Sequence, residues 1–321
     1  MLSREAFSKK QIVCVNIGLG EKMSISNDNI VVKDKDAKVV LKTTMYRLFA
    51  IFVIGHTTLT TKVIANSKKF KFSICFFSPT MKLYDIIGAR MEGNFLLREK
   101  QYSYNSNYAA KEIIANKIEN QLRTLKKVRE KSPLMLDNIK QIEKIKHKYN
   151  LEEQLSIQQI MGFEGAIAKL YFAAIFEDKQ WKRRIPRVKF DYINASLDIG
   201  YTLLFNYIDA ILNVFGFDTY KGVLHQEFYM RKSLVCDIVE PLRTIIDWKT
   251  RKAMNLNQIT EDDFTLRNNQ YTLDWKQNRK YTKLYLEAIL DNKDKIFHYV
   301  QSYYRAFMKG YDKVDFPKIE V

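Results

Sequence analysis

Short apolar runs, separated by clusters of turn-forming residues, fill the first 103 positions of the chain. Runs of β-branched and aromatic residues bounded by Asn, Asp, Ser and Pro are typical of strands joined by turns. The apolar run at 48–55 falls far short of the roughly 18 residues that suggest a membrane span, so we expect a buried strand there. These patterns predict a small β domain of about six strands over 1–103, with one helix at 58–70 lying across the sheet.

The spacing of apolar residues changes near residue 104 to the period of an α-helix. An Asn- and Ser-rich stretch at 102–108 marks the boundary. We therefore predict an α+β fold class, in which a small N-terminal β-sheet domain (1–103) is followed by a larger all-α domain (104–321). Residues 316–321 are expected to be irregular. The expected helices include those at 109–131, 134–149, 156–178 and 192–217.

The segment from Gly222 to Arg243 places two acidic residues beside a predicted kink. Its apolar residues recur at helical spacing, so Asp237 and Glu240, three residues apart, lie on the same side of the helix. Pro241 interrupts the helix because it lacks an amide hydrogen and restricts the preceding residue. Two carboxylates at such a kink are suited to bind a cation.

His225 precedes Asp237 by twelve residues and adds a potential nitrogen ligand. The alternative is that both acids are solvated or paired with Lys232 and Arg243. Two acids three residues apart are common on helices, so the spacing alone leaves both interpretations open.

The apolar helix predicted at 156–178 has little polar surface, so we expect a core helix with a further acid, Glu164, buried in its middle. Burying an unpaired carboxylate costs several kcal/mol, so Glu164 must be protonated, paired or bound to a cation. A buried ion pair with an arginine is the structural alternative. Gly162 and Gly165 weaken a helix and suggest that something approaches it closely. Tyr171 lies two turns beyond Glu164, on the same face.

The formal net charge of +17 indicates a polyanionic partner, for which nucleic acid is favoured over a membrane. The excess is spread along the chain, with +9 in residues 1–100 (17 Lys and Arg against 8 Asp and Glu) and +8 in the rest. The densest basic cluster surrounds Trp181. An aromatic residue among arginines is typical of a surface that follows phosphates and stacks bases. The predicted nucleic-acid contacts in this cluster are Lys182, Arg183, Arg184 and Arg187, with a solvated face as the alternative.

Several classes of protein are excluded by what the sequence lacks. It has no Gly-rich phosphate loop, no H-E-x-x-H and no G-x-S-x-G, which removes nucleoside triphosphatases, zinc peptidases and common serine hydrolases. The three cysteines are far apart and form no C-x-x-C pair, so we expect reduced thiols in a cytoplasmic protein. No signal peptide is expected, because no apolar stretch follows the charges of the first residues.

Glu164, His225 and the Asp237/Glu240 pair together form an incomplete shell for a divalent cation. Oxygen-rich shells suit Mg²⁺, and the imidazole makes Mn²⁺ equally suitable. Such a metal would polarise a phosphodiester and activate a water or a 3′-hydroxyl.

Four stretches of the sequence resemble successive motifs of a known family. They are GNFLLREKQY at 93–102, GFEGAIAKLYF at 162–172, NASLDIGYTLL at 194–204 and GVLHQEFYMRKSLVCDIVEPLR at 222–243. In order and spacing they are similar to those of the CRISPR-associated endonuclease and integrase of the adaptation module, the CRISPR-associated protein one family.

The resemblance implies Glu164, His225 and Glu240 as metal ligands, with Asp237 as a neighbouring catalytic acid, and makes the helical domain the catalytic domain. It further implies a homodimer that joins a small partner, CRISPR-associated protein two, and inserts short DNA fragments into a CRISPR array by 3′-hydroxyl attack. Beside the basic cluster, Tyr171, Arg231 and Arg243 are predicted DNA contacts, although Tyr171 could serve packing alone; of the three, Arg243 matches an arginine of the family motif.

Two other functions remain open from the sequence. One is a DNA-binding scaffold with a degenerate site, in which the acids only pair with arginines. The other is a repair nuclease for branched DNA, which would use the same metal chemistry on a different substrate.

Overall fold

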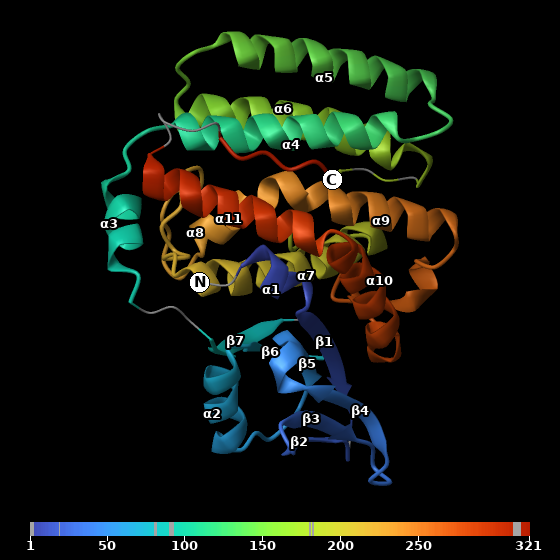
Figure 1. Cartoon of the computed structure of the whole chain (residues 1–321). Coiled ribbons are helices and arrows are strands. Elements are labelled where there is room, and N and C mark those ends of the chain that lie inside the picture. Colours follow the sequence, from blue (N-terminus) through green and yellow to red (C-terminus); the bar gives the residue numbers. More distant parts are fainter. Residues whose placement is uncertain are drawn as a thin grey trace.

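The strands of the N-terminal part lie at one end of the molecule, and the helices are layered at the other (Figure 1). This computed structural model describes residues 3–18, 20–79, 82–89, 93–179, 181, 183–310 and 316–321. Within these ranges, no helix is both long and apolar enough to span a membrane.

A four-stranded sheet with the order β1-β5-β6-β7 forms the centre of the N-terminal part. β5 (Leu48–Gly55) pairs in parallel with both β1 (Gln11–Ile17) and β6 (Ser73–Phe77), and β7 (Leu83–Gly88) is antiparallel to β6. The buried strand predicted at 48–55 is confirmed, since every side chain from Leu48 to Ile54 is buried. Two parallel strands need a crossover connection. The predicted helix provides it as α2 (Thr61–Phe70), which joins β5 to β6.

The two faces of β5 pack into two different cores. Phe52 and Ile54 belong to a core that continues into the helical part, whereas Ile51 and Val53 face a smaller core. Successive side chains of a strand point to opposite faces, so one strand serves both. A second sheet covers the smaller core and consists of the antiparallel strands β2 (Lys22–Ser26), β3 (Asn29–Lys33) and β4 (Val39–Thr44).

The helical part confirms the predicted fold class, in which N-terminal sheets precede a mostly helical region. The predicted helices appear with slightly different bounds, and Pro241 ends one helix and begins a 3₁₀ turn. The helices and 3₁₀ turns are α1 (Arg4–Ser8), η1 (Met45–Arg47), α3 (Phe95–Ser103), α4 (Tyr108–Lys126), α5 (Pro133–Leu151), α6 (Ile157–Ile175), η2 (Glu177–Lys179), α7 (Tyr192–Phe215), α8 (Ser233–Val239), η3 (Glu240–Leu242), α9 (Arg243–Asn255), η4 (Glu261–Asp263), η5 (Trp275–Gln277), α10 (Asn278–Asp291) and α11 (Lys293–Lys309).

One hairpin departs from the all-α composition expected beyond residue 104. β8 (Phe264–Arg267) and β9 (Gln270–Leu273) pair antiparallel. The two residues between them, Asn268 and Asn269, have φ angles of 49° and 56°. Two left-handed residues in succession suit a tight hairpin turn, and asparagine tolerates that conformation.

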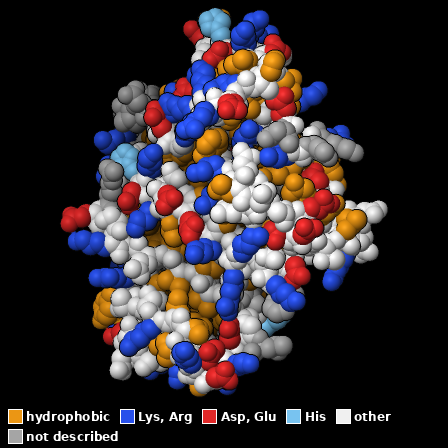
Figure 2. Space-filling model, turned by 90° about the vertical axis from the view of Figure 1, so that its right-hand side faces the viewer, with side chains coloured by type: hydrophobic (Ala, Val, Ile, Leu, Met, Phe, Trp, Pro, Cys, Tyr) orange, Lys and Arg blue, Asp and Glu red, His pale blue; other side chains and the backbone are white. Residues whose placement is uncertain are grey.

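Positive charge is spread over the molecule, as the sequence indicates. On the face shown in Figure 2, Lys and Arg side chains occur over both the helical end and the strand-bearing end, with Asp and Glu between them. The basic surface is therefore not confined to one domain.

Two sets of glycines have opposite surroundings. A Cβ added to Gly200 in α7 would lie 2.4 Å from Cγ2 of Ile246 and 2.9 Å from Cδ1 of Tyr285, so α7 approaches α9 and α10 closely only because this side chain is absent. Nothing lies within 4 Å of a Cβ at Gly162 or Gly165. No described part of the chain therefore makes the close approach to α6 that these two glycines suggest.

These surroundings predict opposite effects for the same substitution. Gly200→Ala forces a methyl group into the contact between three helices and should lower the free energy of unfolding by about 1–3 kcal/mol. Gly162→Ala adds a better helix former in open space and should raise it by up to about 1 kcal/mol. Urea unfolding followed by circular dichroism measures both. Equal stabilities of the two variants would contradict the close approach at Gly200.

Candidate active site

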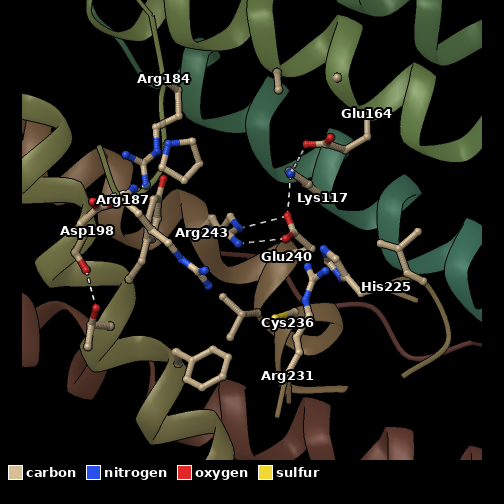
Figure 3. Close-up of a pocket in the computed structure, with 18 of the residues that line it drawn as sticks. Lys117, Glu164, Arg184, Arg187, Asp198, His225, Arg231, Cys236, Glu240 and Arg243 are labelled. Carbon is tan, nitrogen blue, oxygen red and sulfur yellow. Dashed lines mark hydrogen bonds and ion pairs between the residues drawn. The ribbon is translucent and has the colours of Figure 1, made fainter. Parts of the chain in front are cut away.

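The three predicted metal ligands, Glu164, His225 and Glu240, all line one cleft of about 1680 Å³. They come from three separate segments: α6, the loop before α8, and η3. Figure 3 shows Glu164 and Glu240 on opposite sides of the Lys117 side chain, with His225 beside Glu240.

Glu164 is positioned by α6, which begins at a capping box formed by Ser156 and Gln159. The helix is less buried than its apolar sequence predicts, because Met161 and Ala166 are exposed and Glu164 keeps 27% of its side-chain surface. The expectation of a fully buried acid in a core helix is therefore wrong.

The partner of Glu164 is a lysine rather than the arginine considered above. Nζ of Lys117, on α4, lies 2.5 Å from Oε1 of Glu164 and 2.6 Å from Oε2 of Glu240. Burial lowers the pKa of Lys117, but the two carboxylates raise it more, so the pKa lies above its ordinary value. The ammonium is thus a fixed positive charge between two acids.

Glu240 follows α8 and starts the 3₁₀ turn that contains Pro241. Arg243 donates to both of its oxygens, from Nε at 3.1 Å and from Nη2 at 3.0 Å. Burial raises the pKa of Glu240, but Arg243 and Lys117 outweigh it and hold the pKa well below its usual range. Glu240 is therefore a permanent anion at the inner end of the cleft.

Asp237 is fully buried and does not face the cleft as Glu240 does. Its carboxylate accepts backbone N–H bonds from Val223 (2.6 Å), Leu224 (3.1 Å) and His225 (3.0 Å). Oδ1 also lies 2.6 Å from Nδ1 of His225. A carboxylate with these partners holds the imidazole orientation and leaves the other ring nitrogen for a ligand or a proton.

A glycine makes room for this arrangement. A Cβ added at Gly222 would lie 2.7 Å from Oδ2 of Asp237 and 2.9 Å from Cβ of Ser233. The loop can therefore fold over the carboxylate only with glycine at this position.

The donor set fits a divalent cation, but the ligands are not preassembled. Two carboxylates and one oriented imidazole are suitable ligands in chemical type. Among the described residues, no three His, Cys, Asp or Glu side chains already converge as a metal site. Because Lys117 stands between Glu164 and Glu240, a cation that binds both carboxylates has to displace its ammonium.

The arginines predicted to contact DNA mostly line the same cleft. Arg183, Arg184, Arg187, Arg231 and Arg243 all border it. Arg184 is partly engaged within the protein, since its guanidinium donates to Asp198 at 2.5 Å. The predicted contact Lys182 lies outside the described residues.

Tyr171 cannot contact DNA, because it is completely buried. Its hydroxyl donates to Asp247 at 3.0 Å, and the hydroxyl of Tyr201 donates to the same carboxylate. Burial raises the pKa of Asp247 to about 6. The prediction of a DNA contact at Tyr171 is therefore wrong, and the residue instead helps to satisfy a buried acid.

Tyr201 connects this buried acid to the arginines of the cleft. Its ring lies 4.8 Å from the guanidinium of Arg243 and 5.2 Å from that of Arg184. A cation–π contact of this kind helps to hold Arg243, in addition to its hydrogen bonds with Glu240.

Sequence reasoning missed Lys117, Tyr201 and Asp247. A signal for Lys117 existed, because it falls on the apolar stripe of α4 beside Ile113, Ile114 and Ile118, all fully buried. A lysine at such a position needs a buried acid as its partner.

Comparison with known proteins gives a consistent result. The model of the family described as CRISPR associated protein Cas1 matches residues 17–287. A CRISPR-associated endonuclease Cas1 from Thermodesulfovibrio yellowstonii is 32% identical over 225 residues, which are 67% of this chain and 71% of that protein.

Two solved structures share the fold. A casposase bound to integration product has a TM-score of 0.77 and 21% identity, and the match covers 97% of this chain and 94% of that one. A chain of a Cas6-RT-Cas1–Cas2 complex has a TM-score of 0.79 and 22% identity. That match covers 97% of this chain but only 36% of the longer chain.

The four motifs at 93–102, 162–172, 194–204 and 222–243 all fall inside the matched range, and the resemblance that they carry is confirmed. The chain belongs to the CRISPR associated protein Cas1 family of endonucleases.

Proposed function

We propose that this chain is a divalent-metal-dependent DNA endonuclease and integrase that inserts short DNA fragments into a CRISPR array by 3′-hydroxyl attack on phosphodiesters. The observation that carries the proposal is the convergence of Glu164, His225 and Glu240 on one cleft bordered by arginines. Acids and an imidazole beside guanidinium groups suit a reaction that adds negative charge to a phosphate.

Glu164, His225 and Glu240 would hold the metal, for which Mg²⁺ and Mn²⁺ are the candidates. When bound, the ion would polarise the phosphodiester and lower the pKa of the attacking hydroxyl.

The residues of the chain itself hold and orient the reacting groups. Arg243, held between Glu240 and Tyr201, presents a fixed guanidinium toward the cleft, where a phosphate oxygen can accept from it. Asp237 fixes His225 so that the free ring nitrogen points away from the buried carboxylate. Arg187 and Arg231 border the cleft and would neutralise the phosphates on either side of the reacting one.

The proposed substrates are a short DNA fragment and the leader–repeat DNA of a CRISPR array, and the proposed partners are a second copy of the chain and Cas2. The net charge of +17 supports binding to DNA. The names of the similar structures also support these partners, because one is a casposase bound to integration product and another contains Cas2.

One observation favours a second function, a DNA-binding scaffold. Glu164 and Glu240 are both paired with basic side chains, as a degenerate site would have them. The scaffold binds DNA in a salt-dependent way but performs no metal-dependent chemistry, so the experiment below separates the two functions.

We predict that Glu164→Ala, His225→Ala and Glu240→Ala each reduce strand transfer by at least about 100-fold, since each removes a group that stabilises transition-state charge. The protein, its small partner and a short duplex are incubated with a leader–repeat plasmid and Mg²⁺ or Mn²⁺, and covalent joining is measured. DNA affinity should change little.

The matched control is Glu119→Ala. Glu119 lies on the same helix as Lys117 and pairs with Lys146 at 3.4 Å, so its loss should leave joining intact. Full joining by any of the three variants, or joining by the wild type in EDTA, would overturn the proposal.

We also predict that Lys117→Met strengthens Mn²⁺ binding, because the metal no longer competes with an ammonium for Glu164 and Glu240. In EDTA the same variant should be less stable by about 3 kcal/mol, since two acids lose a buried partner. Electron paramagnetic resonance of free Mn²⁺ measures affinity, and thermal unfolding measures stability. Lys146→Met is the control that should change neither; weaker Mn²⁺ binding by Lys117→Met would show that Lys117 assists the metal instead.

A further inference from the structure

The residues 316–321, here named the anchor segment, lie outside the range 17–287 that the family model matches. They are irregular, as expected from the sequence, but they are packed against the protein, since Phe316 and Ile319 are only 6% and 4% exposed. Figure 1 shows the segment running alongside α4. It therefore packs against the helix that carries Lys117.

Two asparagines of α4 recognise the backbone of the anchor segment. Asn116 donates from Nδ2 to the carbonyl of Ile319 and accepts from the N–H of Ile319 through Oδ1, both at 2.9 Å. Asn120, one turn further, donates to the same carbonyl at 2.9 Å. Both asparagines are at most 1% exposed. Water therefore cannot compete for these hydrogen bonds while the segment is in place.

Asn120 also connects the anchor segment to the proposed metal site. Its amide nitrogen donates a second hydrogen bond, 2.8 Å long, to the carbonyl of Pro241. Pro241 follows Glu240 directly in η3. The side-chain amide of Asn120 thus links Ile319 to the 3₁₀ turn that contains Glu240.

Lys117 makes a second connection between the same two elements, because its ammonium binds Glu240 from α4. Asn116 and Asn120 flank Lys117 in the sequence, so the anchor segment holds the turns of the helix on either side of it. Contacts at the rim add charge complementarity, such as Arg123 with Glu320 at 2.6 Å, but they are exposed and contribute little.

We propose that the anchor segment is a positioning element of the metal site. It holds α4 against η3 through Asn116 and Asn120. Asn120 is the positioning residue, because it connects the anchor segment to the turn that carries Glu240. This inference rests on the proposed metal site and deepens it, since it assigns a role in metal binding to residues that do not line the cleft. Groups that orient metal ligands typically contribute about 10- to 100-fold to metal affinity.

The test compares the Mn²⁺ affinity of the wild-type chain with the affinities of two single variants and of the corresponding double variant. Asn120→Leu keeps the size of the side chain but removes the hydrogen bonds to Ile319 and Pro241, and Ile319→Asp places a charge where the segment is buried. Each should weaken Mn²⁺ binding by about tenfold. Free Mn²⁺ is measured by electron paramagnetic resonance at a temperature where every variant is folded. Both changes act through the same contact. The double variant should therefore bind Mn²⁺ no more weakly than the single variant that has the lower Mn²⁺ affinity.

The matched control is Asn278→Leu. Asn278 is also buried and also donates from its amide to a backbone carbonyl, that of Pro79, but it does not border the cleft. It should lose thermal stability as Asn120→Leu does while its Mn²⁺ affinity stays within about twofold of the wild type.

The inference is overturned if Asn120→Leu and Ile319→Asp bind Mn²⁺ as the wild type does, or if Asn278→Leu loses as much affinity as they do. Failure of the proposed function gives a different result. In that case the wild type either does not bind Mn²⁺ or binds it no more tightly than Glu164→Ala and Glu240→Ala do.

Discussion

The ammonium of Lys117 is the interaction on which the arrangement of the helical part depends. It joins α4 to α6 through Glu164 and α4 to η3 through Glu240. Two carboxylates this close would repel each other without a cation between them, and the cost of that repulsion rises as burial excludes water. The chain therefore brings its two acids together with a positive charge of its own, which a metal bound to both acids would have to replace.

The sequence predicts those features that depend on neighbours along the chain. The wholly apolar run of β5 predicts a buried strand, and Pro241 predicts the break at which Glu240 stands. His225 and Asp237 are close enough in sequence for one loop to bring them together. Their residue types suggest a cation site, and the resemblance assigns the separate roles of ligand and neighbouring acid. The Asn268–Asn269 turn carried a local signal as well, and it was overlooked.

The remaining features depend on which surfaces meet in space. The apolar sequence of α6 predicted a core helix because hydrophobicity reports a preference for burial and not the presence of a covering element. The partners of Glu164 and Ile319 lie on α4, and no local pattern pairs residues so far apart. Tyr171 shows the same limit, since its position on the helix was compatible with either a surface or a core role.

The sequence separation of these contacts has a consequence for synthesis. Lys117 and Glu240 are 123 residues apart, and Asn116 and Ile319 are 203 apart. Domains form as the chain leaves the ribosome, and contacts between distant residues form last. A ribosome-bound chain that has completed α4 and α6 thus holds one acid and the lysine, but lacks Glu240 and the anchor segment. A nuclease built in this way has no assembled site during most of its own translation.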